Sequence, residues 1–143
     1  MSSLKVLRLN ARAQLPTYAT DGAACFDFYA AHDALVPAYH AALIGTDLAV
    51  EVPEDYVLQM YPRSGLAFRH LVTLANSPAI IDADYRGEVK FMLVNHGPKP
   101  VTVLAGDRVA QAMLVHAPRV AIEEVAELSE TERGTGGFGS TGR

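Results

Sequence analysis

The chain has 143 residues, of which 50% are hydrophobic and 20% are charged, and this balance predicts one folded domain with its own core. Twelve basic against sixteen acidic residues give a net charge of −4, which argues against nonspecific binding to nucleic acid or to a membrane. The single cysteine excludes a disulfide framework, and the absence of paired histidines argues against a zinc site. No apolar run is long enough to span a bilayer, which favours a cytoplasmic chain that begins at Met1.

The N-terminal part of the chain is predicted to form strands. Residues 5–9 alternate polar and apolar side chains, and a loop through Pro16 follows. Residues 23–30 form an apolar run that Asp27 interrupts. A carboxylate in such a run is costly to bury unless it is hydrogen-bonded or faces a polar cleft, so Asp27 is either a turn-stabilising acceptor or a site residue. Cys25, in the same run, is interpreted as a small buried hydrophobe.

Short apolar runs then recur along most of the chain, separated by glycine and proline. This pattern is typical of an all-β sandwich, barrel or jelly roll in which helices are scarce. The predicted strands are 34–36, 41–44, 48–52, 56–61, 71–74, 88–94, 101–104, 108–115 and 120–125.

One segment has a helical composition. Residues 64–70 contain no β-branched side chain, and Ser64 can serve as the N-cap. A helix that begins directly after Arg63 gathers free N–H groups, a hydroxyl and a guanidinium in one place, which suits an anion. The alternative is a capped single turn that only closes one end of the domain.

Residues 76–87 carry the densest chemistry in the sequence. If the segment is extended, Asp82 and Asp84 share one face and Tyr85 lies on the other. Two neighbouring carboxylates repel, so one must have a raised pKa or be neutralised by a cation such as Arg86 or by a metal-bound phosphate. The alternative is a hairpin end in which the acids serve only the turn.

The last two segments are a turn and a tail. Residues 106–111 read as a turn that leads into a strand, where Asp107 and Arg108 could form only a solvated pair and Gln111 can face either side. Residues 133–143 contain five glycines and one aromatic residue, and they lack the lysine and the following helix of a P-loop. Such a tail is either a floppy terminus or a flexible clamp that folds over a polyphosphate.

Taken in order, five stretches resemble the motifs of the homotrimeric dUTPase (deoxyuridine 5′-triphosphate nucleotidohydrolase) family. They are residues 24–30, 62–67, 79–87, 106–111 and 133–141. The resemblance implies an all-β, jelly-roll-like β-barrel over 1–132 of the β-clip type, with one short helix after Ser64, and a glycine-rich arm over 133–143 that closes a neighbouring subunit's site. It also implies a homotrimer that converts dUTP and water into dUMP and pyrophosphate. That reaction keeps uracil out of DNA and supplies dUMP for thymidylate synthesis.

The resemblance also assigns roles to individual residues. Asp82 matches the general base, and Mg²⁺ is expected to bind through the substrate's phosphates with no direct protein ligand, although Asp27 matches an acid that holds the metal's water shell. Tyr85 matches the ring against the deoxyribose and Asn76 a group near the uracil. The remaining matches are phosphate contacts and arm residues, namely Arg63, Ser64, Gly65, Gln111, Arg133, Phe138, Gly139, Ser140 and Thr141.

The departures from the family pattern are modest. Cys25 stands at a usual glycine, Phe28 at a leucine, Ala79 at a glycine and Val109 at an isoleucine. Glycine at the position of Ala79 lets the backbone approach the base, so the added methyl group could shift the uracil pocket or its affinity. Two rival functions share the features described: a dCTP deaminase of the same fold, and a noncatalytic jelly-roll module whose motifs only bind nucleotides.

Overall fold

The structure is a computed structural model that describes residues 3–142. Within this range the chain forms eleven strands and one helix, and the strands account for most of the ordered elements. Their bounds are β1 (Lys5–Arg8), β2 (Thr17–Tyr18), β3 (Phe26–Tyr29), β4 (Ala34–Val36), β5 (Ala41–Glu51), β6 (Tyr56–Tyr61), α1 (Ser64–His70), β7 (Val72–Leu74), β8 (Ala79–Ile81), β9 (Glu88–Asn95), β10 (Val101–Val103) and β11 (Arg108–His116).

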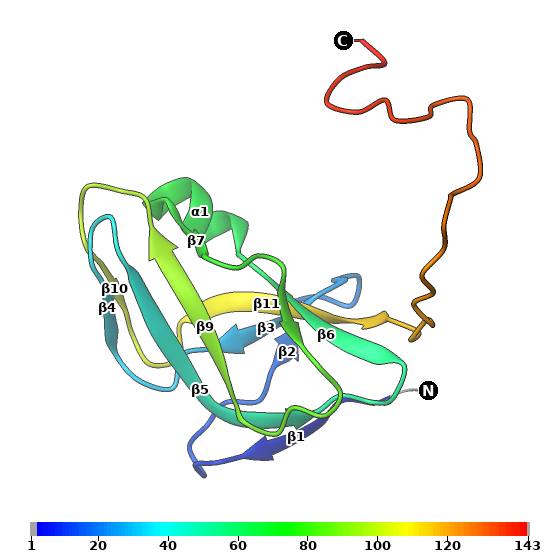
Figure 1. Ribbon diagram of the computed structural model, residues 1–143. Coiled ribbons are helices and arrows are strands. Elements are labelled where there is room, and N and C mark those ends of the chain that lie inside the picture. Colours follow the sequence, from blue (N-terminus) through cyan, green and yellow to red (C-terminus); the bar gives the residue numbers. More distant parts are fainter. Residues whose placement is uncertain (1–2, 143) are drawn as a thin grey trace.

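The strands pair antiparallel in three sheets (Figure 1). A four-stranded sheet has the order β1-β5-β9-β7, a five-stranded sheet has the order β2-β3-β11-β6-β8, and β10 pairs with β4. Neighbouring strands of a sheet are often far apart in sequence, which is the pattern of crossing connections in a jelly roll. The predicted all-β, jelly-roll-like fold is therefore confirmed, with three hydrogen-bonded sheets in place of one continuous barrel in the part of the chain described.

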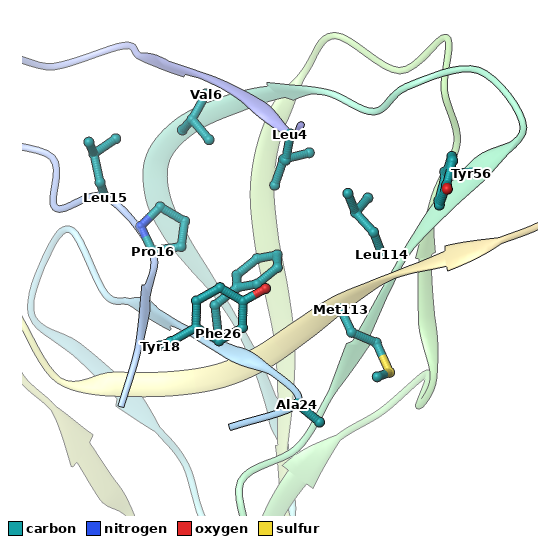
Figure 2. Close-up of a pocket in the computed structure, with 10 residues that line it drawn as sticks. All are labelled: Leu4, Val6, Leu15, Pro16, Tyr18, Ala24, Phe26, Tyr56, Met113 and Leu114. Atoms are coloured by element: carbon teal, nitrogen blue, oxygen red, sulfur yellow. The ribbon is translucent and has the colours of Figure 1, made fainter. Parts of the chain in front are cut away.

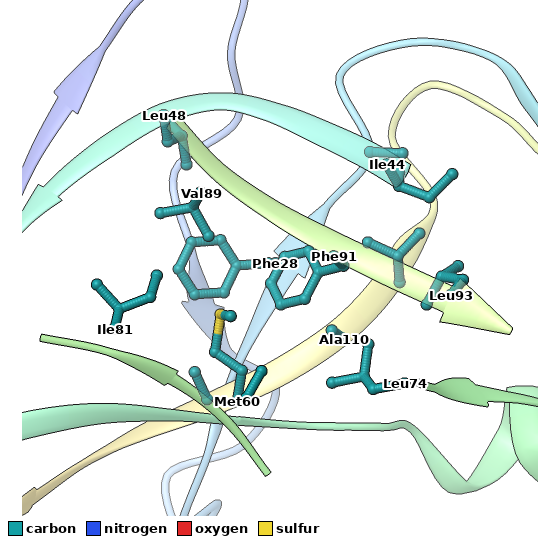
Figure 3. Close-up of a cluster of buried hydrophobic side chains, with 14 of the residues drawn as sticks. Phe28, Ile44, Leu48, Met60, Leu74, Ile81, Val89, Phe91, Leu93 and Ala110 are labelled. Carbon is teal, nitrogen blue, oxygen red and sulfur yellow. The ribbon is translucent and has the colours of Figure 1, made fainter. Parts of the chain in front are cut away.

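The core lies between the two larger sheets. Strand β9 shows why: its side chains alternate between buried and accessible, so that Val89, Phe91 and Leu93 face inward. The ring of Phe91 lies 5.4 Å from that of Phe28 on β3, and this contact joins the two sheets (Figure 3). Phe28, which stands at a usual leucine of the family pattern, is fully buried and fills the centre of this layer.

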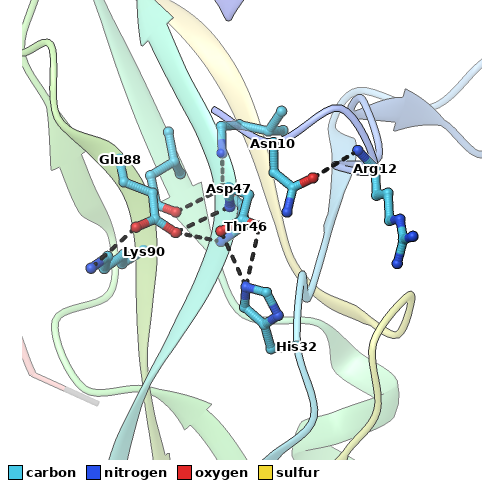
Figure 4. A network of polar contacts seen from close by, with 9 residues as sticks. Asn10, Arg12, His32, Thr46, Asp47, Glu88 and Lys90 are labelled. Atoms are coloured by element: carbon cyan, nitrogen blue, oxygen red, sulfur yellow. Dashed lines mark hydrogen bonds and ion pairs between the residues drawn. The ribbon is translucent and has the colours of Figure 1, made fainter. Parts of the chain in front are cut away.

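Strand β5 differs from the prediction, because the two expected strands are one long strand with a bulge. Its register against β9 shifts between Gly45 and Ala49. Oε1 of Glu88 accepts hydrogen bonds from the backbone N–H groups of Thr46 and Asp47, each at 3.1 Å (Figure 4). A Cβ atom at position 45 would lie 2.6 Å from the same oxygen, so a side chain there would displace the carboxylate. The carboxylate thus satisfies the donors that the bulge leaves unpaired.

The helix is found where it was predicted, but its cap is not. Arg63 is the N-cap residue, with an extended backbone, and the cap has no side-chain hydrogen bond. Ser64 is instead the first helical residue and is exposed. The predicted N-cap role of Ser64 is therefore wrong.

The predicted strand at 120–125 is also wrong. The chain leaves the body after β11 and runs outward without pairing (Figure 1). Val120 and Ile122 are 79% and 99% exposed, so the apolar alternation that predicted a strand has no partner surface in one chain.

Conversely, the short β2 at Thr17–Tyr18 was predicted as loop, because two residues give no periodic signal. Among the residues described, no helix is long and apolar enough to cross a membrane.

Candidate active site

One group of predicted site residues converges at the end of the five-stranded sheet. Gln111 on β11 pairs with Asp27 on one side and with Tyr61 on the other, so that three strands contribute to one row. Nε2 of Gln111 donates a hydrogen bond of 2.9 Å to the carbonyl oxygen of Pro62. This contact fixes the chain immediately before Arg63, and the first, second and fourth motifs meet there.

Asp27 lies between two guanidinium groups at this place. Its Oδ1 is 2.9 Å from Nε of Arg63, and its Oδ2 accepts a hydrogen bond of 3.2 Å from Nη1 of Arg108. Nη1 of Arg63 also donates to the carbonyl oxygen of Arg108, at 3.2 Å. Asp27 is 6% exposed, and charge pairing explains how a carboxylate is accommodated in an apolar strand. The sequence-based alternative of a turn-stabilising acceptor is wrong.

Arg108 is the functional candidate that sequence reasoning missed. It was interpreted as half of a solvated pair with Asp107, but Oδ2 of Asp107 instead accepts the backbone N–H of Leu104 at 2.9 Å. The side chain of Arg108 lines a cavity of about 630 Å³ together with Arg63 and Gly65. The usable signal was its position three residues before Gln111, at the start of the same strand.

Ser64 and Gly65 add polar groups beside this cavity. Both residues lie in the first turn of α1 and are exposed. No atom lies within 4 Å of a Cβ atom built at Gly65, so its backbone is open to a ligand. The combination of free N–H groups, a hydroxyl and two guanidiniums suits the oxygens of a phosphate chain.

Asp82 belongs to a second polar region. Strand β8 ends at Ile81, and the chain then turns, with the N–H of Tyr85 donating to the carbonyl oxygen of Asp82 at 3.2 Å. The extended segment that would place Asp82 and Asp84 on one face is therefore not formed. Both carboxylates are exposed and line a cavity of about 840 Å³.

The turn is held by its own side chains. Nη1 of Arg86 donates to the carbonyl oxygens of Ala83 and Tyr85, at 2.6 and 2.9 Å. The hydroxyl of Tyr85 donates to the carbonyl oxygen of Glu88 at 3.0 Å, and a Cβ atom at Gly87 would overlap the tyrosine ring. Arg86 thus stabilises the turn through its carbonyl groups, and Gly87 leaves room for the ring.

Asn76 and Ala79 precede Asp82 along the chain, in the connection to β8 and at the beginning of β8. Asn76 is exposed in the connection between β7 and β8, which links an edge of one large sheet to an edge of the other. Ala79 is 4% exposed and belongs to the core cluster. Its methyl group therefore packs inward against the core, and the effect of Ala79 on the uracil pocket stays a prediction.

Strand register separates the two regions within one chain. Ile81 pairs with Leu58 on β6, so Asp82 is level with the beginning of that strand, whereas Arg63 follows its end. The six residue steps from Val57 to Arg63 correspond to roughly 20 Å of extended chain. The cavity beside Asp82 and the cavity beside Arg63 have no lining residue in common.

The predicted arm residues belong to neither region in a single chain. The segment from Arg133 onward lies away from the strands (Figure 1). Nε of Arg133 donates to the carbonyl oxygen of Gly136 at 2.8 Å, and Phe138 is fully exposed. Gly139 has a φ of +90°, and the neighbouring Ser140 and Thr141 are exposed.

An apolar groove of about 690 Å³ lies elsewhere on the molecule, beneath the edge strands β1 and β2 (Figure 2). It is lined almost entirely by apolar and aromatic side chains and contains none of the predicted site residues. The lining residues are Leu4, Val6, Leu15, Pro16, Tyr18, Ala24, Phe26, Tyr56, Met113 and Leu114.

Comparison with known proteins is in accord with this geometry. The family model described as dUTPase matches residues 11–142. The chain is 46% identical over 140 residues to the deoxyuridine 5′-triphosphate nucleotidohydrolase of Nautilia profundicola, covering 98% of this chain and 99% of that protein. It is 44% identical over 142 residues to the protein of the same name from Clostridium acetobutylicum, covering 99% and 98%. The chain belongs to the dUTPase family.

Solved structures show the same fold. The dUTPase of Staphylococcus bacteriophage 80alpha with dUPNHPP has a TM-score of 0.93 and 25% sequence identity, and both chains are covered completely. A mutant dUTPase from phage phi11 of S. aureus, which coordinates a structural Mg(II) ion, has a TM-score of 0.81 and 22% identity over 87% of this chain and 97% of that one. The five motifs thus lie in a fold that matches these proteins along most or all of the chain.

Proposed function

We propose that the chain hydrolyses dUTP to dUMP and pyrophosphate in the cytoplasm, which keeps uracil out of DNA and supplies dUMP for thymidylate synthesis. The family membership and the names of relatives at 46% and 44% identity support this activity. The rival activity of a dCTP deaminase and the rival role of a noncatalytic module have no comparable support.

Asp82 is the proposed general base for the attacking water. Its carboxylate is exposed beside a large cavity, so water and a substrate can reach it. Tyr85 is proposed to lie against the deoxyribose. Its hydroxyl is hydrogen-bonded to the carbonyl oxygen of Glu88, and the residue as a whole is 44% exposed, so a ligand can reach it. Asn76 is proposed to lie near the uracil.

The phosphate chain is assigned to the region around Arg63. Arg63, Ser64, Gly65 and Gln111 are the proposed contacts, because the hydrogen bond from Gln111 to Pro62 holds the start of α1 beside the cavity. Hydrolysis of a phosphoanhydride requires an aligned nucleophile and neutralised oxygens rather than covalent help from the protein. Asp82 serves the first need and the cationic region serves the second.

The distance between the two regions is the observation that carries the proposed assembly. Asp82 and Arg63 of one chain are too far apart to act on one triphosphate, so a complete site needs a second copy of the chain. A homotrimer provides three such sites related by rotation. The exposed Val120 and Ile122 and the apolar groove beneath β1 and β2 support association, because such surfaces are costly to leave in water.

The proposed domain boundary lies between residues 132 and 133. Residues 1–132 form the body in this proposal, and residues 133–143 form an arm that closes a neighbouring subunit's site. The arm has little to pack against in its own chain, and the positive φ angles of Gly134, Gly139 and Gly142 support a backbone that can turn sharply around a ligand. Its proposed contacts with uracil and the terminal phosphate are Arg133, Phe138, Gly139, Ser140 and Thr141.

Magnesium is proposed to bind through the substrate's phosphates. Among the residues described, no group of three His, Cys, Asp or Glu side chains could hold a metal ion, and both oxygens of Asp27 already contact guanidiniums. When bound, Mg²⁺ would neutralise charge on the phosphate oxygens.

Asp82→Asn tests the proposed base. We expect turnover of dUTP to fall at least about 100-fold while binding of dUTP is retained, because the amide cannot accept the proton of water. Pyrophosphate release and calorimetric titration measure the two properties, and parallel assays with dCTP that detect ammonia distinguish the deaminase. Asp84→Asn is the matched control in the same turn, with an expected change of less than about threefold. Unchanged turnover in Asp82→Asn would refute the assignment.

A further inference from the structure

Asp27, Arg63 and Arg108 form a linked cluster, which the binding of a phosphate by one arginine alone would not require. The carboxylate receives a different guanidinium on each oxygen, at 2.9 and 3.2 Å, and Arg63 additionally donates to the backbone of Arg108. The three side chains come from β3, the N-cap of α1 and the beginning of β11. Asp27 is nearly inaccessible, whereas the side chains of Arg63 and Arg108 are 25% and 45% exposed.

We infer that Asp27 is a positioning residue that holds Arg63 and Arg108 together as one pair of phosphate-binding guanidiniums. The inference rests on the proposed function, and it adds Arg108 to the substrate contacts.

The hydrogen-bond donors support this assignment. A guanidinium has five N–H groups. The contacts described for Arg63 use its Nε and Nη1, and the contact with Asp27 uses Nη1 of Arg108. Donors on both side chains are therefore left for a ligand in the cavity of about 630 Å³ that both residues line.

The charges support it as well. Two guanidiniums and one carboxylate carry a net charge of +1, which attracts phosphate and not a metal cation. Without the carboxylate, two like charges would face each other and separate. Asp27 thus serves to keep both cations close enough for one phosphate chain.

The test compares Asp27→Asn, Arg108→Gln and the double variant with the unchanged protein. Pyrophosphate release is measured across dUTP and Mg²⁺ concentrations. We expect each single change to raise the KM for dUTP by about tenfold or more, with the Mg²⁺ concentration for half-maximal activity unchanged at saturating dUTP. The KM of the double variant is expected to exceed that of the poorer single variant by no more than about twofold, because both changes break the same pair.

Two results would overturn the inference. One is a shift of the Mg²⁺ midpoint in Asp27→Asn with an unchanged KM, which would assign the residue to the metal. The other is an unchanged KM in Arg108→Gln, a result that remains informative if Asp27→Asn does not fold. Arg12→Gln, an exposed arginine in the loop before β2, is the matched control and is expected to leave KM unchanged. Lack of dUTP hydrolysis by the unchanged protein would instead refute the proposed function.

Discussion

At the scale of single residues, the site depends on where small and charged side chains are placed. Gly87 leaves room for the ring of Tyr85, which occupies the space of a Cβ atom, and the methyl group of Ala79 enters the core. Asp27 could be recognised from the sequence as an unusual acid, but its partners could not. Arg63 and Arg108 are 36 and 81 residues away along the chain, and only folding brings them together.

Gly87→Ala tests the placement of the tyrosine ring. The added methyl group must displace the ring of Tyr85, so we expect the KM for dUTP to rise about three- to tenfold with a smaller effect on kcat. Steady-state pyrophosphate release provides the measurement. Gly22→Ala is the control, since no atom lies within 4 Å of a Cβ atom there. Equal kinetics for the two variants would contradict the role of the ring.

Cys25 provides a pH-dependent prediction. Burial and, to a smaller extent, the charge of Asp27 raise the pKa of the Cys25 thiol. The native chain therefore holds this proton more tightly than the unfolded chain, so the stability gained is present below the unfolded pKa and is lost as pH rises through the folded pKa. We expect iodoacetamide to label native Cys25 with a pH midpoint above that of the urea-unfolded chain. Coincident midpoints would exclude the effect.

At the scale of secondary structure, strands were predictable where they alternate and are long enough. Strands β4 and β6 have the predicted bounds, and β9 and β11 differ from theirs by one residue at the C-terminal end. Whether the other segments form strands depended on the presence of a pairing partner. The alternating residues 120–125 form no strand because the chain carries them away from its own sheets, and β5 is continuous because Glu88 on the neighbouring strand satisfies its bulge.

Glu88→Ala tests that bulge. The change leaves the N–H groups of Thr46 and Asp47 without their shared acceptor, so we expect the free energy of unfolding to fall by about 2 kcal/mol. Urea titration measures the loss. Lys90→Ala removes the neighbouring salt-bridge partner of Glu88 and is expected to cost less than about 1 kcal/mol, since both side chains are partly exposed. Equal losses would show that the ion pair, and not the bulge, is the stabilising feature.

At the scale of the whole molecule, the proposed site residues of one chain do not come together in one place. The proposed phosphate region and the proposed base lie at opposite ends of β6, and the arm lies away from the strands. This arrangement predicts a particle of three times 15.4 kDa in solution, and it predicts that each site combines residues of different chains.

Mixed assemblies of two inactive variants test this sharing. Asp82→Asn keeps the phosphate region, and Arg63→Gln keeps the proposed base. If each site takes Asp82 from one chain and Arg63 from its neighbour, an equal co-expressed mixture regains about one quarter of the unchanged activity. About half of the sites receive an intact Asp82, and about half of those also receive an intact Arg63. Pyrophosphate release from the purified mixture, at the same mass as each parent, is the measurement. Activity no higher than that of the parents would contradict a shared site.

The sequence alone determined the strands with clear alternation, the single helix, the five motifs and through them the family. These properties are local, because periodicity and short motifs depend on residues a few positions apart. The tertiary structure alone decided that Asp27 joins two arginines, that Ala79 faces the core and that Asp82 lies far from Arg63. Those facts depend on strand pairing between distant segments, and the pairing register has no signature within either segment.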